Sequence, residues 1–303
     1  MASLSVYIRE TRPQFLLLTP ACFLVGVGTA VLSGGGPGIN IGQLLIVLVG
    51  AVAAHAAVNV LNDYFDYKSG LDLNTQRTPF SGGSGILPAG AMSPTGALML
   101  GLGALAATVG VGIYVMITKG PGILWAGLPG LILVAFYTQI ITKRPWLCLL
   151  APGLGFGPCM VLGTHFALVG SYSWTAIVAS LVPGLLVSNL LLLNQFPDVE
   201  ADRLVCRHHV PILFGRKKSA VIYAGIALGT YAWLVLAVLL HLLPWPALIA
   251  LLPLPLVLST SRGVRKHADN LPQLIPLLGQ NVMFTLATPV LLALGLLASR
   301  MWL

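Results

Sequence analysis

Charged residues are scarce in this sequence, and acidic residues are the scarcest. The 303 residues include 16 lysines and arginines but only 8 aspartates and glutamates, so 8% of the chain is charged. An ordinary soluble domain carries charge on roughly a quarter of its residues. Hydrophobic residues make up 57% of the chain, and the mean hydropathy is +0.91. This composition excludes a soluble globular domain and indicates an integral membrane protein embedded in a lipid bilayer.

Cysteines and metal-binding patterns are also few. The four cysteines are scattered without the spacing of a metal or redox site: Cys22, Cys148, Cys159 and Cys206. His208 and His209 are adjacent, but no second ligand pair is spaced for zinc. No Walker-type phosphate loop is present, and the glycine run at 153–157 favours close helix packing. The sequence therefore gives no sign of a zinc, redox or P-loop centre.

Long apolar stretches take up most of the chain. A bilayer core about 30 Å thick is crossed by a helix of about 20 residues. Nine stretches have about this length, at residues 14–33, 42–66, 94–118, 121–141, 147–168, 174–196, 219–242, 244–260 and 271–299. The sequence therefore predicts an all-α integral membrane protein, a bundle of nine transmembrane helices in a single domain over residues 1–303.

The basic residues are sorted by side of the membrane. With the N-terminus in the cytoplasm, 14 of the 16 fall in inner segments, and only Lys119 and Arg300 fall outside. Inner loops of membrane proteins are enriched in lysine and arginine. This pattern accounts for the net charge of +8 without a nucleic-acid partner. It predicts a cytoplasmic N-terminus, an outer C-terminus and a multi-pass protein of the cell membrane, which is the inner membrane in a bacterium.

Six of the eight acidic residues form two clusters, after the second and the sixth predicted helices. Both lie on the predicted cytoplasmic side. In the first, Asn59, Asn62, Asp63 and Asp66 follow a helical i, i+3, i+4, i+7 spacing, and His55 lies one turn earlier. In the second, Asn194, Asp198 and Asp202 share one face if the helix continues through Pro197. Two such stripes at equal depth predict one shared cavity facing the cytoplasm.

The chemistry of these clusters suits a metal and a diphosphate. Oxygen-rich sites with a few carboxylates and substrate phosphates are typical of Mg²⁺. Basic residues bracket both clusters, and a diphosphate is neutralised by metal and basic donors together: Lys68, Arg77, Lys143, Arg144, Arg203 and Arg207. The alternative interpretation is a pair of solvated interfacial loops, which leaves the near absence of acids from the other inner loops unexplained.

These residues resemble the UbiA superfamily of intramembrane prenyltransferases. That superfamily has nine transmembrane helices and two motifs, NDxxDxxxD after helix two and DxxxD after helix six, which bind Mg²⁺ and a prenyl diphosphate. Asn62–Asp63 with Asp66, and Asp198 with Asp202, match these motifs. Arg12–Pro13 heads the first helix, and Tyr137 and Lys143 lie near the loop between helices four and five. The resemblance covers the whole chain.

Two departures bear on the branch of the superfamily. Gly70 stands where the third aspartate is expected, and Asp72 follows two residues later. This spacing is similar to that of the branch that prenylates 1,4-dihydroxy-2-naphthoate in menaquinone synthesis. That branch commonly has Gly-Lys-x-Thr after the second motif, where this chain has Cys206–Arg207–His208–His209. Arg207 then takes the cationic role.

The resemblance implies a role for each site residue. Asp63, Asp66, Asp198 and Asp202 are the expected catalytic residues and, together with Asp72, the expected Mg²⁺ ligands. The expected substrate-binding residues are Arg12, Asn59, Asn62, Lys68, Arg77, Tyr137, Lys143, Asn194 and Arg207. Segments 68–92 and 199–218 are the expected cap loops. Tyr137, Phe65 and Phe196 are candidates to face an allylic cation.

The expected function is Mg²⁺-dependent transfer of a prenyl group from its diphosphate to an aromatic acceptor in lipoquinone synthesis. Two alternatives stay open. A terpene cyclase of the same superfamily would use the same diphosphate site without an acceptor. A cation-coupled transporter would also place carboxylates in a helical bundle, although its site usually lies near the membrane midplane. No obligate protein partner is predicted.

Overall fold

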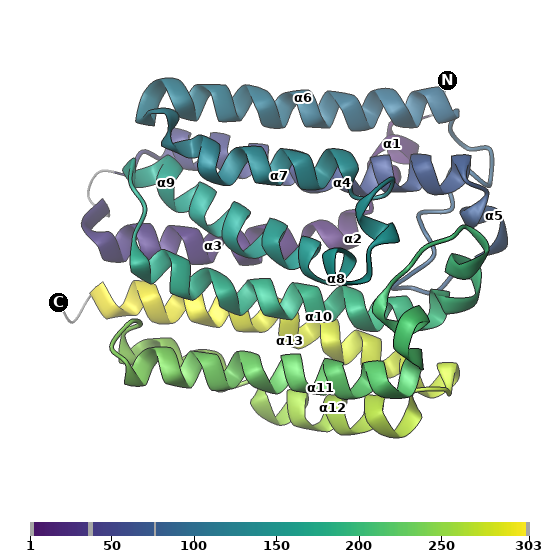
Figure 1. Cartoon of the computed structure of the whole chain (residues 1–303). Coiled ribbons are helices and arrows are strands. Elements are labelled where there is room, and N and C mark those ends of the chain that lie inside the picture. Colours follow the sequence, from purple (N-terminus) through teal and green to yellow (C-terminus); the bar gives the residue numbers. More distant parts are fainter. Residues whose placement is uncertain (1–2, 36–38, 76, 301–303) are drawn as a thin grey trace.

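The long helices of the chain lie side by side in one bundle (Figure 1). The computed structural model describes residues 3–35, 39–75 and 77–300, and these residues contain helices, turns and loops but no strand. The N-terminal half contains α1 (Leu4–Glu10), α2 (Pro13–Leu16), α3 (Leu18–Ala30), η1 (Val31–Gly35), α4 (Ile41–Lys68), α5 (Leu71–Asn74), α6 (Pro94–Lys119), η3 (Pro121–Ile123), α7 (Leu124–Phe136) and η4 (Ile141–Lys143).

The C-terminal half continues the bundle with longer helices and two broken ones. It contains α8 (Pro145–Leu154), η5 (Gly155–Leu162), α9 (Gly163–Val169), α10 (Trp174–Leu204), α11 (Val210–Leu239), η6 (Trp245–Leu251), α12 (Leu254–His267) and α13 (Leu271–Ser299). Interior prolines account for irregular stretches, because proline removes a backbone donor and crowds the preceding turn. Pro158 lies inside the π-helical segment η5, and Pro253 separates η6 from α12.

Eight helical segments of the described chain are long and apolar enough to cross a membrane. They are Pro13–Gly34, Ile41–Lys68, Pro94–Lys119, Pro145–Val169, Trp174–Leu204, Val210–Leu239, Trp245–His267 and Leu271–Ser299. The stretch predicted at 121–141 is a shorter apolar helical segment, Pro121–Phe136. The prediction of an all-helical membrane bundle is confirmed. The ninth crossing and the sides of the two termini stay predictions.

The region after the second motif differs from its prediction. We expected a cap loop over 199–218, but α10 runs on to Leu204 and α11 begins at Val210. Only residues 205–209 connect the two helices. Helix α10 passes through Pro197 without ending. The packed bundle therefore tolerates the backbone hydrogen bond that Pro197 removes, as is common in membrane helices.

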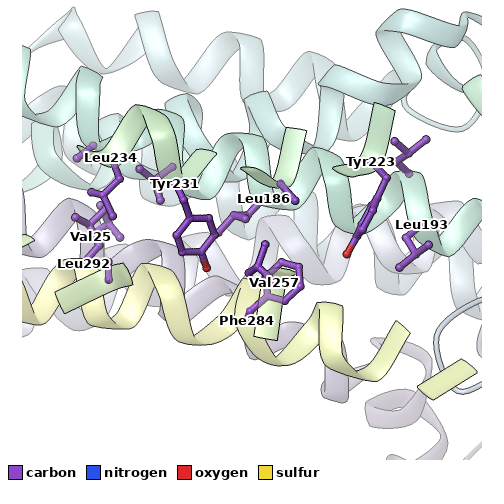
Figure 2. Packing of buried hydrophobic residues seen from close by; sticks show 14 of the residues in the cluster. Val25, Leu186, Leu193, Tyr223, Tyr231, Leu234, Val257, Phe284 and Leu292 are labelled. Atoms are coloured by element: carbon purple, nitrogen blue, oxygen red, sulfur yellow. The ribbon is translucent and has the colours of Figure 1, made fainter. Parts of the chain in front are cut away.

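The main hydrophobic core lies between α10, α11 and α13. Leu186, Tyr231 and Phe284 are among its buried residues, and their side chains meet between these helices (Figure 2). Two buried hydrogen bonds join α11 to α13, from Tyr223 to Asn281 at 3.0 Å and between Tyr231 and Thr288 at 2.6 Å. Polar pairs of this kind help to hold helices together where lipid surrounds them.

The opposite flank of the bundle is more open. Helix α6 lies at the edge of the molecule (Figure 1). It packs along α4 and makes few contacts with α7. Helix α7 packs instead against η5. Glycines bring α8 and η5 close to α10, because a Cβ on Gly157 would lie 2.6 Å from the Cα atom of Gly184. The core on one side and this open flank on the other leave room for a cavity between them.

Candidate active site

A large cavity occupies the open flank of the bundle. Its volume is about 580 Å³, and α4, α6, α7, η5 and α10 supply most of its wall. Its charged and amide side chains gather where α2 begins and where α4 and α10 end: Arg12, Gln14, Asn59, Asn62, Asp66, Asp72, Asn194, Gln195, Asp198, Asp202 and Arg207. The rest of the wall is mainly apolar. The cavity therefore has a polar end and a long apolar body.

Helix α4 supplies the first half of the polar end. It extends to Lys68, as the predicted polar stripe requires, and Asp63 and Asp66 are buried. The Asn62 side-chain amide donates to Asp66 Oδ2 at 3.0 Å and to Thr138 Oγ1 at 3.1 Å. Asn59 donates to the carbonyl oxygen of Thr11 at 3.0 Å. The stripe thus holds the α1–α2 turn and the segment after α7 against one helix.

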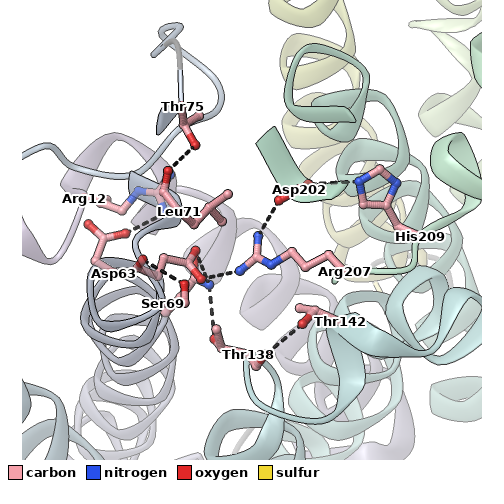
Figure 3. Close-up of polar contacts among 12 residues, drawn as sticks. Arg12, Asp63, Ser69, Leu71, Thr75, Thr138, Thr142, Asp202, Arg207 and His209 are labelled. Carbon is pink, nitrogen blue, oxygen red and sulfur yellow. Dashed lines mark hydrogen bonds and ion pairs between the residues drawn. The ribbon is translucent and has the colours of Figure 1, made fainter. Parts of the chain in front are cut away.

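Arg207 joins the two acidic motifs directly (Figure 3). Its guanidinium contacts Asp66 on α4 and Asp202 on α10, the latter at 3.1 Å between Nη1 and Oδ1. The second oxygen of Asp202 accepts from His209 Nε2 at 2.9 Å. Burial opposes the charged form of Arg207, but the Asp66 and Asp202 carboxylates outweigh burial and raise its pKa. Arg207 is therefore a fixed cation between the motifs.

A second arginine and a loop cover the other side of Asp63. Arg12 Nη1 lies 3.4 Å from Asp63 Oδ1. The backbone N–H of Ser84 donates to Asp63 Oδ2 at 2.7 Å, and the Ser84 hydroxyl donates to Glu10 Oε2 at 2.8 Å. Burial and the nearby Asp63 charge raise the pKa of Glu10 to about 7. The loop after α5 is thus tied to both α4 and α1. That segment 68–92 caps the site stays a prediction.

The geometry explains how Asp72 reaches the site despite its shifted spacing. Helix α4 ends at Lys68, and Gly70 has φ +79°, a left-handed conformation that glycine adopts without strain. The chain then turns into α5, which places Asp72 in the cavity wall, buried. Burial, followed by the Asp66 and Asp63 charges, raises the pKa of Asp72 to about 8. A Cβ on Gly83 would lie 3.0 Å from its carboxylate oxygens.

Some expected substrate-binding residues lie away from the large cavity. Lys68 and Lys143 are exposed and are not part of its wall as the described residues form it. In η4 the buried residues are Ile141 and Thr142, so Lys143 falls on the outer side. Lys68 is two residues beyond the buried Asp66, on another face of α4. The prediction that these two lysines line the diphosphate site therefore finds no support in this geometry.

The aromatic candidates separate in the same way. Tyr137 lines the cavity. Phe196 is fully buried in the main core, and neither Phe196 nor Phe65 belongs to the cavity wall formed by the described residues. His55 does line the cavity, where its Nδ1 lies 2.9 Å from the Thr19 hydroxyl. Tyr137 is thus the expected aromatic residue that the fold brings to the site.

A smaller pocket of about 280 Å³ adjoins the polar end. Arg9, Arg12 and Arg77 line it together with hydroxyl groups of the loop after α5. Arg12, Ser81 and Gly83 line both this pocket and the large cavity. Arg77, expected to bind substrate, therefore lies on the far side of that shared wall. Excess positive charge here would attract an anion arriving at this end.

Several site residues were not singled out from sequence. Glu10, Ser84 and Thr138 carry hydrogen bonds to the aspartate-bearing helix or its loop. His209, which the sequence suggested only as an unsupported zinc ligand, forms a hydrogen bond with Asp202. Glu10 had a usable signal, since it is one of only eight acidic residues in the chain. Ser84 and Thr138 had none, because hydroxyl residues are common in loops and their partners depend on the fold.

The donor set fits a hard divalent cation. Three carboxylate or amide oxygens of the cavity wall are among the buried oxygens of the described chain that lack a hydrogen-bond partner, namely Oδ2 of Asp72, Oδ1 of Asp198 and Oδ1 of Asn194. All three residues line the cavity. Unpaired buried carboxylate and amide oxygens are costly unless a cation or donor satisfies them, and Mg²⁺ prefers such ligands. Among the described residues, no three His, Cys, Asp or Glu side chains are already gathered closely enough to hold one ion.

The fold and the site together define a class of protein. A membrane-spanning helical bundle with a large cavity that is charged at one end and apolar beyond suits a substrate with an anionic head and a hydrocarbon tail. The model of the UbiA prenyltransferase family matches residues 20–274. The chain belongs to that family.

Relatives of known activity agree with this assignment. The chain is 27% identical over 228 residues to 1,4-dihydroxy-2-naphthoate octaprenyltransferase of Bacillus subtilis, covering 74% of this chain and 71% of the relative. It is 26% identical over 285 residues to the protein of that name from Mycobacterium tuberculosis, covering 92% of each. A solved structure of a UbiA homologue from Archaeoglobus fulgidus, bound to DMAPP and Mg²⁺, superposes with a TM-score of 0.65. It covers 94% of this chain and 98% of that one at 15% identity, which supports the fold.

Proposed function

We propose that the chain transfers a prenyl group from its diphosphate to an aromatic acceptor of the dihydroxynaphthoate type. The observation that carries this proposal is the meeting of the two aspartate motifs through Arg207 at one end of an otherwise apolar cavity. An anionic head bound there would leave its hydrocarbon tail in the apolar body. The relatives named for naphthoate prenylation and the Asp72 spacing support the choice of acceptor.

The chain's own residues would stabilise the departing diphosphate. Breaking the carbon–oxygen bond places negative charge on the diphosphate oxygens. Arg12 and Arg207 line the polar end as fixed donors, and preoriented donors of this kind favour a transition state in which charge develops. Tyr137 lines the same region with a neutral aromatic ring, which would interact favourably with an allylic cation by about 0.5–2 kcal/mol.

The carboxylates would hold the metal that accompanies the diphosphate. Asp72 and Asp198, with their unpaired oxygens, are the first candidates, and Asp63, Asp66 and Asp202 complete the expected set. Bound Mg²⁺ supplies Lewis-acid stabilisation of the leaving group. The homologue from Archaeoglobus fulgidus was solved with Mg²⁺ and a prenyl diphosphate, which supports Mg²⁺ as the ion. The site would face the cytoplasm, because the basic segments around it are predicted to lie on that side.

The distribution of carboxylates argues against a cation-coupled transporter. The acidic residues of the cavity wall are Asp66, Asp72, Asp198 and Asp202, and all belong to its polar end. A transported cation would need ligands along its route, particularly near the membrane midplane. Among the described α4 residues that line the cavity between Val47 and Val58, His55 is the one with a polar side chain. A terpene cyclase differs in needing no acceptor, so only an acceptor-dependent assay separates it from the proposed enzyme.

The test is an assay with purified protein in lipid and detergent. Labelled prenyl diphosphates are incubated with Mg²⁺ and with dihydroxynaphthoate, 4-hydroxybenzoate, homogentisate or a glycerol-phosphate lipid, beside Asp66→Asn and Asp198→Asn. We expect acceptor-dependent diphosphate release that needs Mg²⁺ and falls by about 100-fold or more in both variants. Glu200→Gln is the control, because Glu200 is an exposed acid of the same helix.

Each other outcome has a definite meaning. Diphosphate release without any acceptor, together with a cyclic hydrocarbon product, would identify a cyclase. Full turnover in either aspartate variant, or in the presence of EDTA, would contradict the proposed mechanism. Release that depends on the glycerol-phosphate lipid alone would replace the aromatic acceptor.

A further inference from the structure

The cavity continues far beyond the polar end. Along α4 its lining residues run from Asp66 to Val47. At 1.5 Å per helical residue, this is a depth of about 28 Å, close to the thickness of a bilayer core. We call the deeper half, lined by α4 from Val47 to Ala54 and by the facing parts of α6 and α7, the deep arm.

The deep arm ends on a packed floor. Val47, Val115, Ile123 and Ala167 line the cavity and also belong to a buried cluster with Phe166. The Phe166 ring stacks at 4.9 Å on Tyr172. Behind this floor, Gln43 donates to the Ala167 carbonyl oxygen at 2.6 Å. The arm is therefore closed at its far end rather than open to the outer surface.

Two glycines face free space within the deep arm. Gly112 on α6 and Gly127 on α7 both line the cavity. If a Cβ were added to either glycine, no atom of the described residues would lie within 4 Å of it, apart from its chain neighbours and the backbone of its own helix. Glycine is unfavourable inside a helix by roughly 0.8–1 kcal/mol relative to alanine. Close packing does not explain why glycine occupies these two positions. What glycine provides at each of them is free space in the cavity.

Gly112 lies deep in the arm. Gly50 of α4 packs directly against Val111, because a Cβ on Gly50 would lie 2.7 Å from Cγ1 of that valine. Gly112 is thus level with Gly50, which is 16 residues from Asp66 along α4, or about 24 Å. A side chain at Gly112 would block the arm there while leaving the polar end unchanged.

We propose that the deep arm holds the prenyl tail and that Gly112 and Gly127 determine how long a tail it accepts. The inference rests on the proposed function. An isoprene unit extends by four carbon–carbon bonds of about 1.5 Å, hence about 5 Å along a bent chain, so the distance to Gly112 corresponds to about five units. The first five units of a tail would fill the arm as far as Gly112, and a sixth unit would lie beyond it, toward the packed floor.

The experiment compares donors of different length in glycine variants. Gly112→Phe and Gly127→Phe place a ring in the arm, and Gly110→Phe is the matched control. Gly110 also lies on α6 with free space around its Cβ position among the described residues, but it is exposed and outside the cavity wall. We measure kcat/KM with geranyl diphosphate and with hexaprenyl diphosphate, and thermal stability of each variant.

The expected result is a change in preference rather than a loss of activity. The ratio of hexaprenyl to geranyl kcat/KM should fall by about ten-fold or more in the two arm variants, because a filled arm cannot take the longer tail. It should stay within about two-fold of wild type in Gly110→Phe. Gly112→Leu, with a smaller side chain, should give an intermediate ratio and serves if a phenylalanine variant does not fold.

An unchanged ratio in folded Gly112 variants would overturn the inference, as would an equal change in Gly110→Phe. Failure of the proposed function looks different. In that case wild-type protein would transfer neither donor to any acceptor, and the ratio could not be formed.

Discussion

Arg207 is the residue on which the two halves of the site depend. It lies between Asp66 and Asp202, and it comes from a segment where the sequence departs from the pattern of the naphthoate branch. The aspartates could be predicted from sequence, because acidic residues are so rare here that any cluster is informative. The choice of Arg207 over Lys68 and Lys143 could not, since it depends on which side of a helix or turn each residue occupies.

At the same scale, Glu10 predicts a dependence of stability on pH. It is fully buried, and its pKa is raised from 4.5 to about 7 by burial and by Asp63. The folded protein therefore holds this proton more tightly than the unfolded chain. The stabilisation is fully present below pH 4.5 and is lost as the pH rises to about 7, a change of about 3 kcal/mol.

The measurement is thermal unfolding of wild type and Glu10→Gln between pH 4.5 and 8. Glutamine keeps a hydrogen-bonding side chain and stays neutral. The variant should match wild type near pH 4.5, have the higher melting temperature at pH 8, and vary less between these values. Parallel curves for the two proteins would show that Glu10 does not ionise in this way.

At the scale of elements, the hydropathy pattern predicted where most helices lie more accurately than it predicted the residues at which they end. The prediction ended the sixth helix at 196, whereas α10 continues to Leu204 and so carries Asp198 and Asp202 on helical backbone. Proline and charge usually indicate a helix end, but packing against α11 and α8 overrides that local preference here. The irregular helical segments α8–η5–α9 and η6–α12 were likewise predicted as continuous helices, because a hydropathy pattern does not reveal a change from α-helical to π- or 3-10-helical backbone.

The packing of η5 against α10 leads to a prediction about Gly157. A Cβ there would lie 2.6 Å from Gly184 Cα and 2.6 Å from the Ser180 carbonyl oxygen. Gly157→Ala should therefore push the helices apart and destabilise the protein by about 1–3 kcal/mol. Gly155→Ala is the control, because its nearest contact would be Leu133 at 3.9 Å.

Melting temperatures in detergent would compare these two variants. We expect a clear decrease for Gly157→Ala and little change for Gly155→Ala, where the better helix propensity of alanine helps. Equal melting temperatures would mean that η5 and α10 can separate without cost.

At the scale of the whole molecule, the sorting of basic residues predicts the orientation in the membrane. Cys206 gives a natural probe of it. It is the exposed one among the four cysteines, all of which lie in the described chain, and it lies beside the acidic end of the cavity. A maleimide that cannot cross membranes should label it in inverted vesicles and not in intact cells.

Cys206→Ser is the control that should lose this labelling, since Cys22 and Cys148 are buried and the half-buried Cys159 lies within the membrane-spanning segment Pro145–Val169. Labelling of Cys206 from outside intact cells would reverse the predicted orientation and place the site on the outer face. The fold itself would be unaffected by that outcome, because helix packing does not depend on which face meets the cytoplasm.

The polar end of the cavity is assembled from segments that are far apart in the chain. The α1–α2 turn, α4, the loop after α5, α10 and residues 205–209 all contribute to it. No single segment can bind the anionic head of a substrate by itself, so the site forms only when the whole bundle has assembled. A ligand bound there at 100 times its dissociation constant would add about 2.7 kcal/mol to the stability of the complete fold and nothing to partly assembled forms. Donor substrate present during membrane insertion would thus favour complete molecules over incomplete ones.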